Sequence, residues 1–468
     1  MTLTCDSSYV NSIHFDRRFY NEAKTKKFRL NSLGQLSVCT YYLLSSKVYI
    51  IQGVTKLSHN FRIHVCAIRQ APRQTSIARC RIEVSPLHSS LFDRCTISSI
   101  TGLSIPGSTM RRVATSEALR FMVDCLKTAG AAARAAQQQA ELLVEADRLG
   151  HPSHGLNRLE YYVNDIISGD CKPNNTPKVL KENPSTAWVD ANCVLGATAS
   201  HFAMDIAIKK ARETGVGWVS VKGSNHNGMA GYWARKAAEK GFIGMAFTNT
   251  SPLLAPTRSK QPALGTNPIS VVAPASESET FYLDMATTSV AVGKIEMQMR
   301  KGESLPHGWA QGPDGKETTD AELAFETKCL MPLGGGEQTS GYKGYGLAAV
   351  VEMFCGMLSG SNYGHHIRSW SHSGEGGPAN LGHCFVALNP DNFAPGFGDR
   401  LTDCMHHWRG LEPTDPKLPV LAPGDKEKKA AEVTDACGTV SYVAQQIESS
   451  AALAKRLKVE PMKVEKEF

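Results

Sequence analysis

A short segment of the chain gathers polar residues that could bind a small organic acid and move its proton. It spans residues 150–162 and reads GHPSHGLNRLEYY. Ser153 and His154 stand at the start of an expected helix, whose free N–H groups favour an anion. Arg158 and Tyr162 follow one turn apart, and a guanidinium can hold a carboxylate through two parallel hydrogen bonds. His154, beside such a carboxylate, could move a proton on the oxygen of the neighbouring carbon.

Two other interpretations of this segment stay open. Ser153 could simply cap the helix while Arg158 is a surface charge, and the two interpretations are about equally supported by the segment alone. A zinc site at His151 and His154 is disfavoured, because the two histidines stand three residues apart across a proline with no acidic third ligand nearby. We therefore expect no metal.

Two further segments follow expected strands, where a rigid scaffold often positions chemistry. In residues 224–228, His226 could be a second acid or base, a donor that orients the substrate, or an ordinary loop histidine. Asp284 could orient a histidine as the third member of a catalytic relay. Backbone groups of Asp284, Met285 and Ala286 could pair with an amide such as nicotinamide. Asp284 could equally be an N-terminal helix charge.

The usual nucleotide-binding motifs are missing. No GxGxxG follows an expected strand, and residues 336–343 imitate a P-loop only imperfectly, because Tyr342 separates the glycine from the lysine. Weaker candidates remain in two loops of small residues. Thr250 lies in a strand-end loop, and Lys343 stands at a helix start where it could contact a phosphate.

The spacing of apolar residues predicts a mixed α and β protein. Three helices in a row, at residues 116–130, 131–149 and 155–168, suggest a small helical domain, and Gly150 is expected to end the second helix in left-handed geometry. Strands are expected at residues 216–221, 242–249, 269–273, 281–283 and 384–388, and helices near 201–214, 229–240, 289–301 and 345–358.

Composition excludes several protein classes. The chain has 468 residues, 42% of them hydrophobic and 20% charged, which is ordinary globular composition. Its thirteen cysteines include no CxxC pair, so a zinc ribbon or a disulfide scaffold is not expected. Residues 1–112 carry a net charge of +11 and the remainder −4. The main part of the chain therefore gives no electrostatic reason to expect nucleic acid.

The N-terminal quarter, residues 1–112, shows no sustained helical or strand period. Its most apolar stretch, residues 36–54, is interrupted by polar residues too often to cross a bilayer, so we expect no membrane association. We interpret the quarter as a basic, poorly ordered extension, with Met110 as a plausible native start. A transit sequence is the alternative. The expected compartment is the cytoplasm, with organelle targeting left open.

Taken together, the motifs resemble the type 2 malate/L-lactate dehydrogenase family, which includes ureidoglycolate and sulfolactate dehydrogenases. The matching stretches, between about residues 113 and 425, are GHPSHGLNRLEYY, SNHNGMAGYW, TNTSP, LGTNPI, LDMATT, PHGW, LMPLGG and YKGYGL. The resemblance implies a homodimer of α+β fold, with a non-Rossmann, mainly antiparallel NAD(P)-binding domain at residues 191–425. A helical domain at 113–190 would carry the substrate-side motif, and a partly helical tail would follow at 426–468.

The resemblance also implies roles for individual residues. Ser153, His154 and Arg158 match the family's substrate side, with Tyr162 beside them, and His226 matches a proposed proton acceptor. The positions that match cofactor contacts are Thr250, Asp284, Met285, Ala286, Lys343, Gly424, Asp425 and Lys426. Asn227 departs from the family pattern, which usually has an aromatic residue there; this could alter the pocket wall.

From the resemblance and these residues we expect hydride transfer between NAD or NADP and a small 2-hydroxy acid such as malate or lactate. Arg158 would hold the carboxylate, His154 or His226 would take the hydroxyl proton, and Asp284 would stabilise the resulting charge. Two alternatives are a cyclic imine carboxylate reductase of the same fold and a non-catalytic nucleotide-binding relative.

Overall fold

The computed structural model describes residues 110–370 and 376–467, together with five strands before residue 84. The chain divides into two compact units, Met1–Leu103 and Ser104–Phe468. The described strands of the first unit pair antiparallel in chain order: β1 (Thr25–Arg29), β2 (Leu36–Leu44), β3 (Lys47–Thr55), β4 (Phe61–Ala71) and β5 (Gln74–Glu83).

No fold was expected from the sequence for residues 1–112, whereas five strands lie in this range. Strand β4 alternates Phe61, Ile63 and Val65 with Arg62 and His64, which is the period of two that a strand requires. This alternation covers only a few residues, so it does not form the sustained period on which the sequence prediction depended.

The second unit begins with the expected helices, α3 (Thr115–Ala129), α4 (Ala133–Arg148) and α5 (Leu159–Ile167). Gly150, at φ 79°, has the left-handed geometry expected after the second helix. The third helix differs from the prediction, because residues 151–155 form turns and a 3₁₀ turn (Leu156–Arg158) comes before α5. Ser153 and His154 therefore lie in a turn ahead of the helix and do not cap it.

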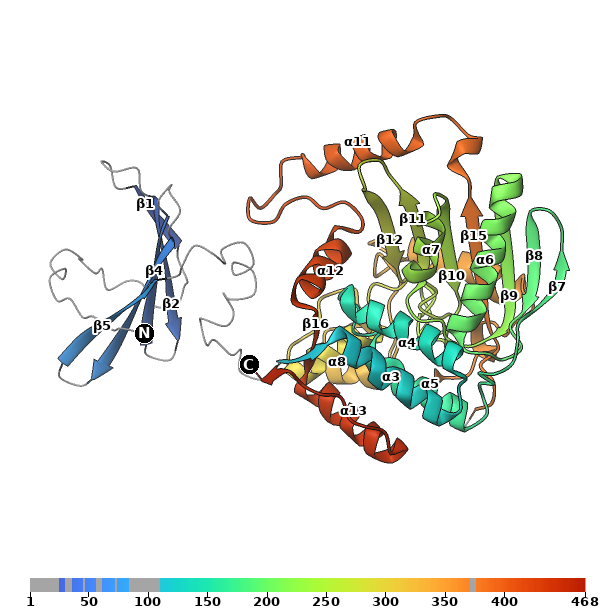
Figure 1. Cartoon of the computed structure of the whole chain (residues 1–468), viewed down its shortest axis with the longest axis horizontal. Coiled ribbons are helices and arrows are strands. Elements are labelled where there is room, and N and C mark those ends of the chain that lie inside the picture. Colours follow the sequence, from blue (N-terminus) through green and yellow to red (C-terminus); the bar gives the residue numbers. More distant parts are fainter. Residues whose placement is uncertain are drawn as a thin grey trace. The chain divides into compact units, whose positions relative to one another are not determined.

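A seven-stranded sheet forms the centre of the second unit (Figure 1). Its order is β12 (Thr280–Met285), β11 (Ile269–Pro274), β10 (Ile243–Thr248), β15 (Leu381–Leu388), β9 (Val216–Ser224), β8 (Thr186–Asp190) and β7 (Lys178–Glu182). Only β8 and β9 run parallel, and all other neighbours are antiparallel. The mixed α/β class is thus confirmed and the sheet is mainly antiparallel. Strands β7 and β8 fall within residues 113–190, the range expected to be helical.

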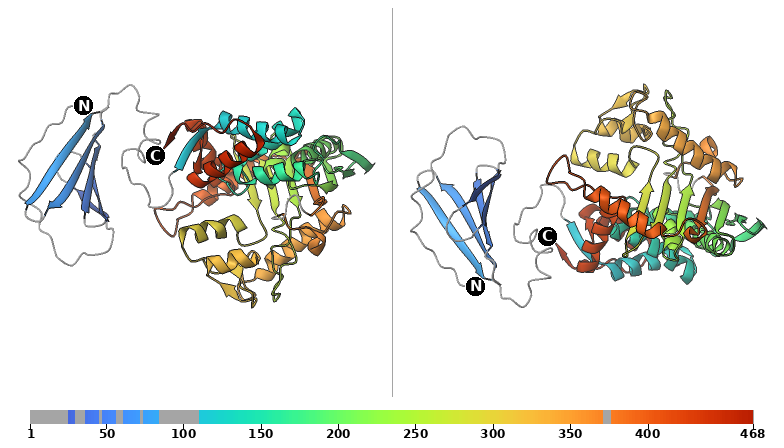
Figure 2. Two further views of the ribbon diagram at one scale, coloured as in Figure 1. Left: turned by 90° about the horizontal axis from the view of Figure 1, so that it is seen from below. Right: turned by 90° about the horizontal axis from the view of Figure 1, so that it is seen from above.

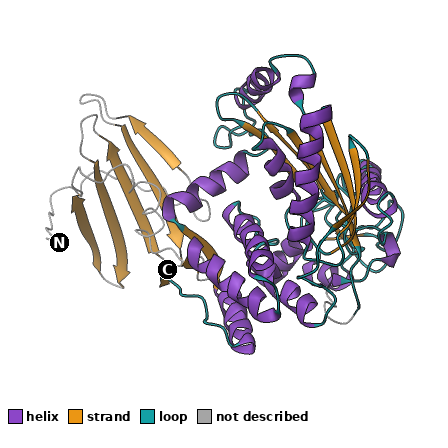
Figure 3. Ribbon diagram, turned by 45° about the vertical axis from the view of Figure 1, so that its right-hand side comes forward, coloured by secondary structure: helices purple, strands orange, loops and turns teal. Residues whose placement is uncertain are grey.

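Helices cover both faces of this sheet (Figures 2 and 3). On one face α6 (Gly196–Thr214) and α7 (Ala230–Ala238) share a buried cluster with Ala246, and on the other α10 (Gly341–Glu352) and the π-helical turn η3 (Met353–Met357) pack against Phe247. Ala246 and Phe247 are consecutive in β10, so they point to opposite faces. A smaller layer contains α8 (Val292–Lys301), β13 (Ala310–Gln311), β14 (Glu317–Thr318) and α9 (Ala321–Thr327).

The C-terminal segment packs back onto the first helices. It contains α11 (Phe397–Arg409), α12 (Asp425–Cys437), β16 (Thr439–Val443), α13 (Ala444–Leu457) and β17 (Lys466–Glu467). Strand β6 (Met110–Ala114) pairs with both β16 and β17. Tyr442 and Leu453 join Phe121 and Met122 in one buried cluster. Residues 426–468, expected to form a tail, thus share the core of the helical region.

Candidate active site

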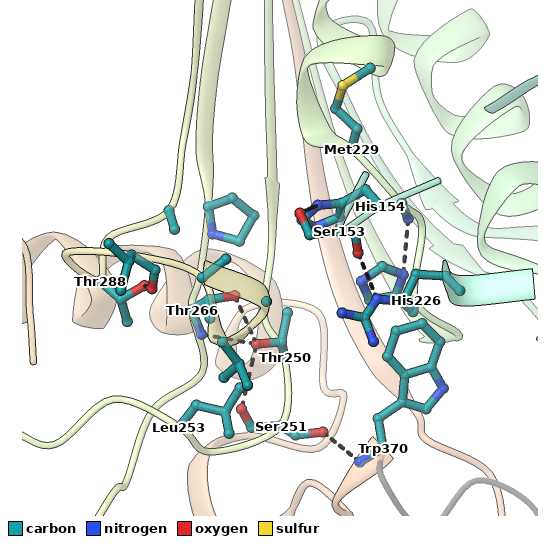
Figure 4. Close-up of a pocket in the computed structure, with 18 of the residues that line it drawn as sticks. Ser153, His154, His226, Met229, Thr250, Ser251, Leu253, Thr266, Thr288 and Trp370 are labelled. Atoms are coloured by element: carbon teal, nitrogen blue, oxygen red, sulfur yellow. Dashed lines mark hydrogen bonds between the residues drawn. The ribbon is translucent and has the colours of Figure 1, made fainter. Parts of the chain in front are cut away.

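One cavity of about 540 Å³ brings together segments that lie far apart in the sequence. Most of the predicted site residues line it: Ser153, His154, Arg158, His226, Thr250, Asp284, Met285 and Ala286. Figure 4 shows the cavity between two walls, with His154, His226 and Trp370 on one side and Thr250, Thr266 and Thr288 on the other. Eight of the residues predicted for the site therefore line one cavity.

A buried carboxylate holds the turn that carries Ser153 and His154 in place. Asp147, near the end of α4, accepts hydrogen bonds from Leu156 N (3.0 Å) and from the Tyr442 hydroxyl (2.8 Å). A Cβ at residue 155 would overlap this carboxylate, so only glycine fits there. Burial raises the pKa of Asp147 to about 7. The Tyr442 hydroxyl thus links strand β16 to the turn of residues 151–155, called the catalytic turn below.

Arg158 is held so that part of its guanidinium stays available. Its Nε donates to the carbonyl oxygen of Ser153 at 2.6 Å. Its central carbon lies 5.4 Å from the ring centre of Tyr161 and 5.9 Å from that of Trp370. These contacts fix the plane of the guanidinium, and the side chain lines the cavity as a carboxylate clamp would.

The two histidines lie side by side on the same wall. Their ring centres are 5.9 Å apart, and Trp370 stacks on His226 at 4.1 Å. His154 Nδ1 lies 3.0 Å from Ser153 Oγ. His226 Nδ1 lies 2.6 Å from the Tyr162 hydroxyl and 3.1 Å from Gly228 N. Both rings thus have one nitrogen engaged by the protein.

Tyr162 was expected to bind substrate, and the structure corrects this. Its side chain is fully buried in the apolar cluster of α3, α4 and α5, and it is not among the residues that line the cavity. The helical periodicity of α5 turns it toward the core. Its hydroxyl reaches the site only through His226.

The charge in the site favours an acid. Burial, with Arg158 and His151 nearby, lowers the pKa of His154 to about 3. Burial also lowers the pKa of His226 well below its usual range, helped by His154 and Arg158. Both imidazoles are therefore neutral at neutral pH, and the guanidinium of Arg158 remains to attract an anion.

Asp284 has a different partner from the expected one. Its Oδ2 accepts a hydrogen bond from Gly231 N at 2.7 Å, at the start of α7. No hydrogen bond joins it to His154 or His226 in the described part of the chain. Burial raises its pKa to about 6. This placement matches the alternative of a helix N-terminal charge, although the helix is α7 and not the one that follows Asp284 in sequence.

Four predicted cofactor residues lie elsewhere. Lys343 is exposed on α10, and Lys426 is exposed on α12. The Asp425 carboxylate accepts two hydrogen bonds from Arg409, at 2.7 and 3.0 Å, and Gly424 packs against Tyr282. None of the four lines the cavity. The Asp425 carboxylate also accepts a hydrogen bond from Ala422 N, so it holds the chain ahead of α12.

Trp370 is a site residue that sequence reasoning missed. Besides stacking on His226, its indole N–H donates to the carboxylate of Asp165 at 3.2 Å. Asp165 is fully buried and also accepts from Asn225 Nδ2 (2.9 Å) and Arg368 Nη2 (2.8 Å). One carboxylate on α5 thus ties together both loops that form this wall. A tryptophan in a polar stretch was the signal that could have pointed to it.

Comparisons with known proteins place the chain in a family. The model of a family described as malate/L-lactate dehydrogenase matches residues 113–449. The chain belongs to the malate/L-lactate dehydrogenase family. It is 41% identical to a malate dehydrogenase of Pyrococcus abyssi over 285 residues, which cover 61% of this chain and 77% of that protein. It is 36% identical over 312 residues to the L-sulfolactate dehydrogenase of Methanocaldococcus jannaschii, covering 66% and 87%.

A solved structure supports the fold of this dehydrogenase. The malate dehydrogenase of Entamoeba histolytica superimposes with a TM-score of 0.71 at 28% identity, covering 75% of this chain and 99% of that one. The predicted family is thereby confirmed. The family match spans residues 113–449, which include every residue that lines the cavity.

Two further findings concern metal binding and membrane spans in the described residues. No group of three histidine, cysteine, aspartate or glutamate residues among them is placed to hold a metal ion. In the same residues, no helix combines the length and apolar character needed to cross a bilayer.

Proposed function

We propose that this family member oxidises a small 2-hydroxy acid reversibly, with transfer of hydride between C2 of the acid and a nicotinamide cofactor, NAD or NADP. The observation that carries the proposal is the shared cavity. His154 and His226 lie on one wall and Thr250 on the other (Figure 4). Arg158, Met285 and Ala286 line the same cavity. An acid held by the first wall would present its C2 to a group held by the second.

The residues present fit a nicotinamide cofactor. Thr250 Oγ1 accepts a hydrogen bond from Thr266 N at 3.0 Å. A Cβ at residue 265 would overlap this hydroxyl, so glycine at 265 lets the two loops of this wall pack closely together. Lys294 and Lys328 also line the cavity and suit a diphosphate. The volume lies in the ~300–1,000 Å³ range of ligand sites. When bound, the cofactor supplies the acceptor or donor of hydride.

The protein's own contribution is binding and proton transfer. Arg158, held by Ser153 and two aromatic rings, would grip the substrate carboxylate. That carboxylate would cancel much of the guanidinium's effect on His154, so the pKa of His154 rises when substrate binds. His154 would then take the hydroxyl proton during oxidation and return it during reduction, a contribution of roughly 10²–10⁴ in rate.

The proposal is tested by following the absorbance of reduced nicotinamide with malate, lactate, sulfolactate and a cyclic imine carboxylate, each with both cofactors. Turnover of a 2-hydroxy acid supports it. Turnover of the imine alone, or of no acid with either cofactor, contradicts it.

A variant locates the chemistry in this cavity. Arg158→Met should raise the KM for the acid by about 10- to 100-fold, since a charge-assisted contact contributes about 1.5–3 kcal/mol. Arg258→Met is the matched control, because Arg258 forms an exposed ion pair with Glu337 away from the cavity. An unchanged KM in Arg158→Met would remove the assigned role.

We also propose a homodimer, formed in a reducing compartment such as the cytoplasm. Exposed apolar side chains recur along α10 and η3 at helical spacing: Leu347, Val350, Met353 and Met357. Such a face is costly to leave in water and suits a second copy of the chain. The eight cysteines in the described part of the chain, Cys125 among them, form no disulfide bond, which fits a reducing compartment.

A further inference from the structure

A backbone N–H group, which can donate a hydrogen bond but cannot accept one, lies against one nitrogen of the His226 ring. Gly228 N lies 3.1 Å from Nδ1 with its hydrogen directed at that nitrogen. A backbone amide has no lone pair to offer, so Nδ1 must present its own lone pair. A neutral imidazole with an unprotonated Nδ1 carries its proton on Nε2.

From this we propose, on the basis of the proposed function, that His226 acts as a fixed neutral Nε2–H donor and that His154 alone exchanges the substrate proton. An Nε2 that already carries a proton has no lone pair with which to accept one. His226 would instead donate a hydrogen bond to the substrate's C2 oxygen. That bond strengthens as charge grows on the oxygen during the reaction.

The orientation of the ring is set by several contacts, not by Gly228 alone. The Tyr162 hydroxyl meets the same Nδ1 at 2.6 Å, and Trp370 stacks on the ring face. The backbone N–H of His226 donates to Asn225 Oδ1 at 2.7 Å, and Asn225 is itself fixed by buried Asp165. A flipped ring would put Cδ2 against the Gly228 amide, and a C–H group cannot accept a hydrogen bond from that N–H.

The surroundings also oppose a second proton on His226. His154, Arg158 and His383 face it from the catalytic turn, the 3₁₀ turn and β15, and each lowers its pKa further below the value set by burial. The charge of Arg368 is balanced by Asp165 at 2.8 Å. An imidazolium would in addition place an N–H against the N–H of Gly228. The neutral form is therefore favoured by both charge and geometry.

His154 has the freedom that His226 lacks. Its Nδ1 faces Ser153 Oγ at 3.0 Å, and a hydroxyl can accept a hydrogen bond as well as donate one. With the proton on Nδ1 directed to Ser153, Nε2 is free to accept. In oxidation the O–H bond of the acid breaks and its proton passes to His154 Nε2. A bound nicotinamide would supply the hydride acceptor, so the C2–H bond would break with its electron pair and C2–O would become a carbonyl. Reduction reverses each of these transfers.

The tautomer can be read directly in the full-length protein. Nitrogen NMR of ¹⁵N-histidine-labelled protein, with His226→Gln used to assign the signals, should show the His226 proton on Nε2 and no titration between about pH 5 and 9. A proton on Nδ1, or an imidazolium signal in that range, would overturn the proposal. This measurement does not depend on turnover, so its failure is distinct from failure of the dehydrogenase function.

Kinetics then separate the two histidines. His226→Ala should lower kcat by about 10²–10³, the effect of removing one oxyanion donor. The plot of kcat against pH should keep the limb that reports the ionisation of His154. His226→Gln, which keeps an N–H donor, should recover part of that loss. His154→Gln should abolish the limb itself. Loss of the limb in the His226 variants, with its retention in His154→Gln, would assign the proton to His226 and refute the proposal.

Discussion

At the scale of single residues, the charge of Arg158 adds to burial in lowering the pKa of the neighbouring His154. Arg158 is among the main reasons, after burial, that the pKa of His154 falls to about 3. In Arg158→Met this charge is gone while much of the side-chain volume remains, so the pKa of His154 should rise toward its ordinary value of 6.5. An NMR titration of the imidazole signals measures it, and no upward change would mean that burial acts alone.

A second effect at this scale is acid sensitivity. His383 is fully buried between Thr248 Oγ1 and Ser224 Oγ, each 2.8 Å away, and burial lowers its pKa to about 3. The unfolded chain binds this proton below about pH 6.5 but the folded protein does not. Stability should therefore fall as pH drops from about 6.5 toward 3, by up to about 1.4 kcal/mol per pH unit for each such histidine.

Urea unfolding at several pH values measures this slope. In His383→Gln the protein should be less stable at pH 8 but should lose stability less steeply on acidification. An equal slope in both proteins would show that His383 does not contribute to the acid loss.

At the scale of elements, the C-terminal strand supports the catalytic turn. Tyr442→Phe removes the hydroxyl that donates to Asp147, leaving a buried carboxylate with one hydrogen bond fewer. We expect a loss of about 1–3 kcal/mol in unfolding free energy and a lower kcat, because the turn that carries His154 loses a support. Thermal melting and steady-state kinetics report the two effects.

The matched control for this change is Tyr232→Phe, which also removes a hydroxyl from a buried tyrosine, on α7. If both variants lower kcat equally, the link from β16 to the turn has no special role. A normal kcat in Tyr442→Phe would contradict the link as well.

At the scale of the whole molecule, we expect two copies of the chain to form the dimer through the apolar face of α10 and η3. Met353 and Met357 are about half exposed and one turn apart. Met353→Glu with Met357→Glu places two carboxylates on this face and should shift the sedimentation coefficient from dimer to monomer. The same change at Leu418, exposed in a loop, is the control. A wild-type protein that sediments as a monomer would contradict the proposed dimer.

Much of the architecture was accessible from local patterns. The three N-terminal helices and five of the seven strands of the large sheet follow apolar spacing, because each element must bury one face. The pattern could not show where the chain would pair. Strands β7 and β8 joined the sheet, and β16 and β17 joined β6, through contacts between distant segments.

For the site, the amino-acid sequence by itself determined which chemical groups are available: the guanidinium of Arg158, the two imidazoles and the small polar loops, in an order shared with a family. Only the tertiary structure decided what each group meets. Tyr162 lies in the core and contacts His226 from there. Asp284 accepts a hydrogen bond at the start of α7, and Asp425 accepts from Arg409. The N–H of Gly228 donates to His226 Nδ1. The reason is physical: a side chain's chemistry is local, whereas its hydrogen-bond partners and burial are set by segments far away in the chain.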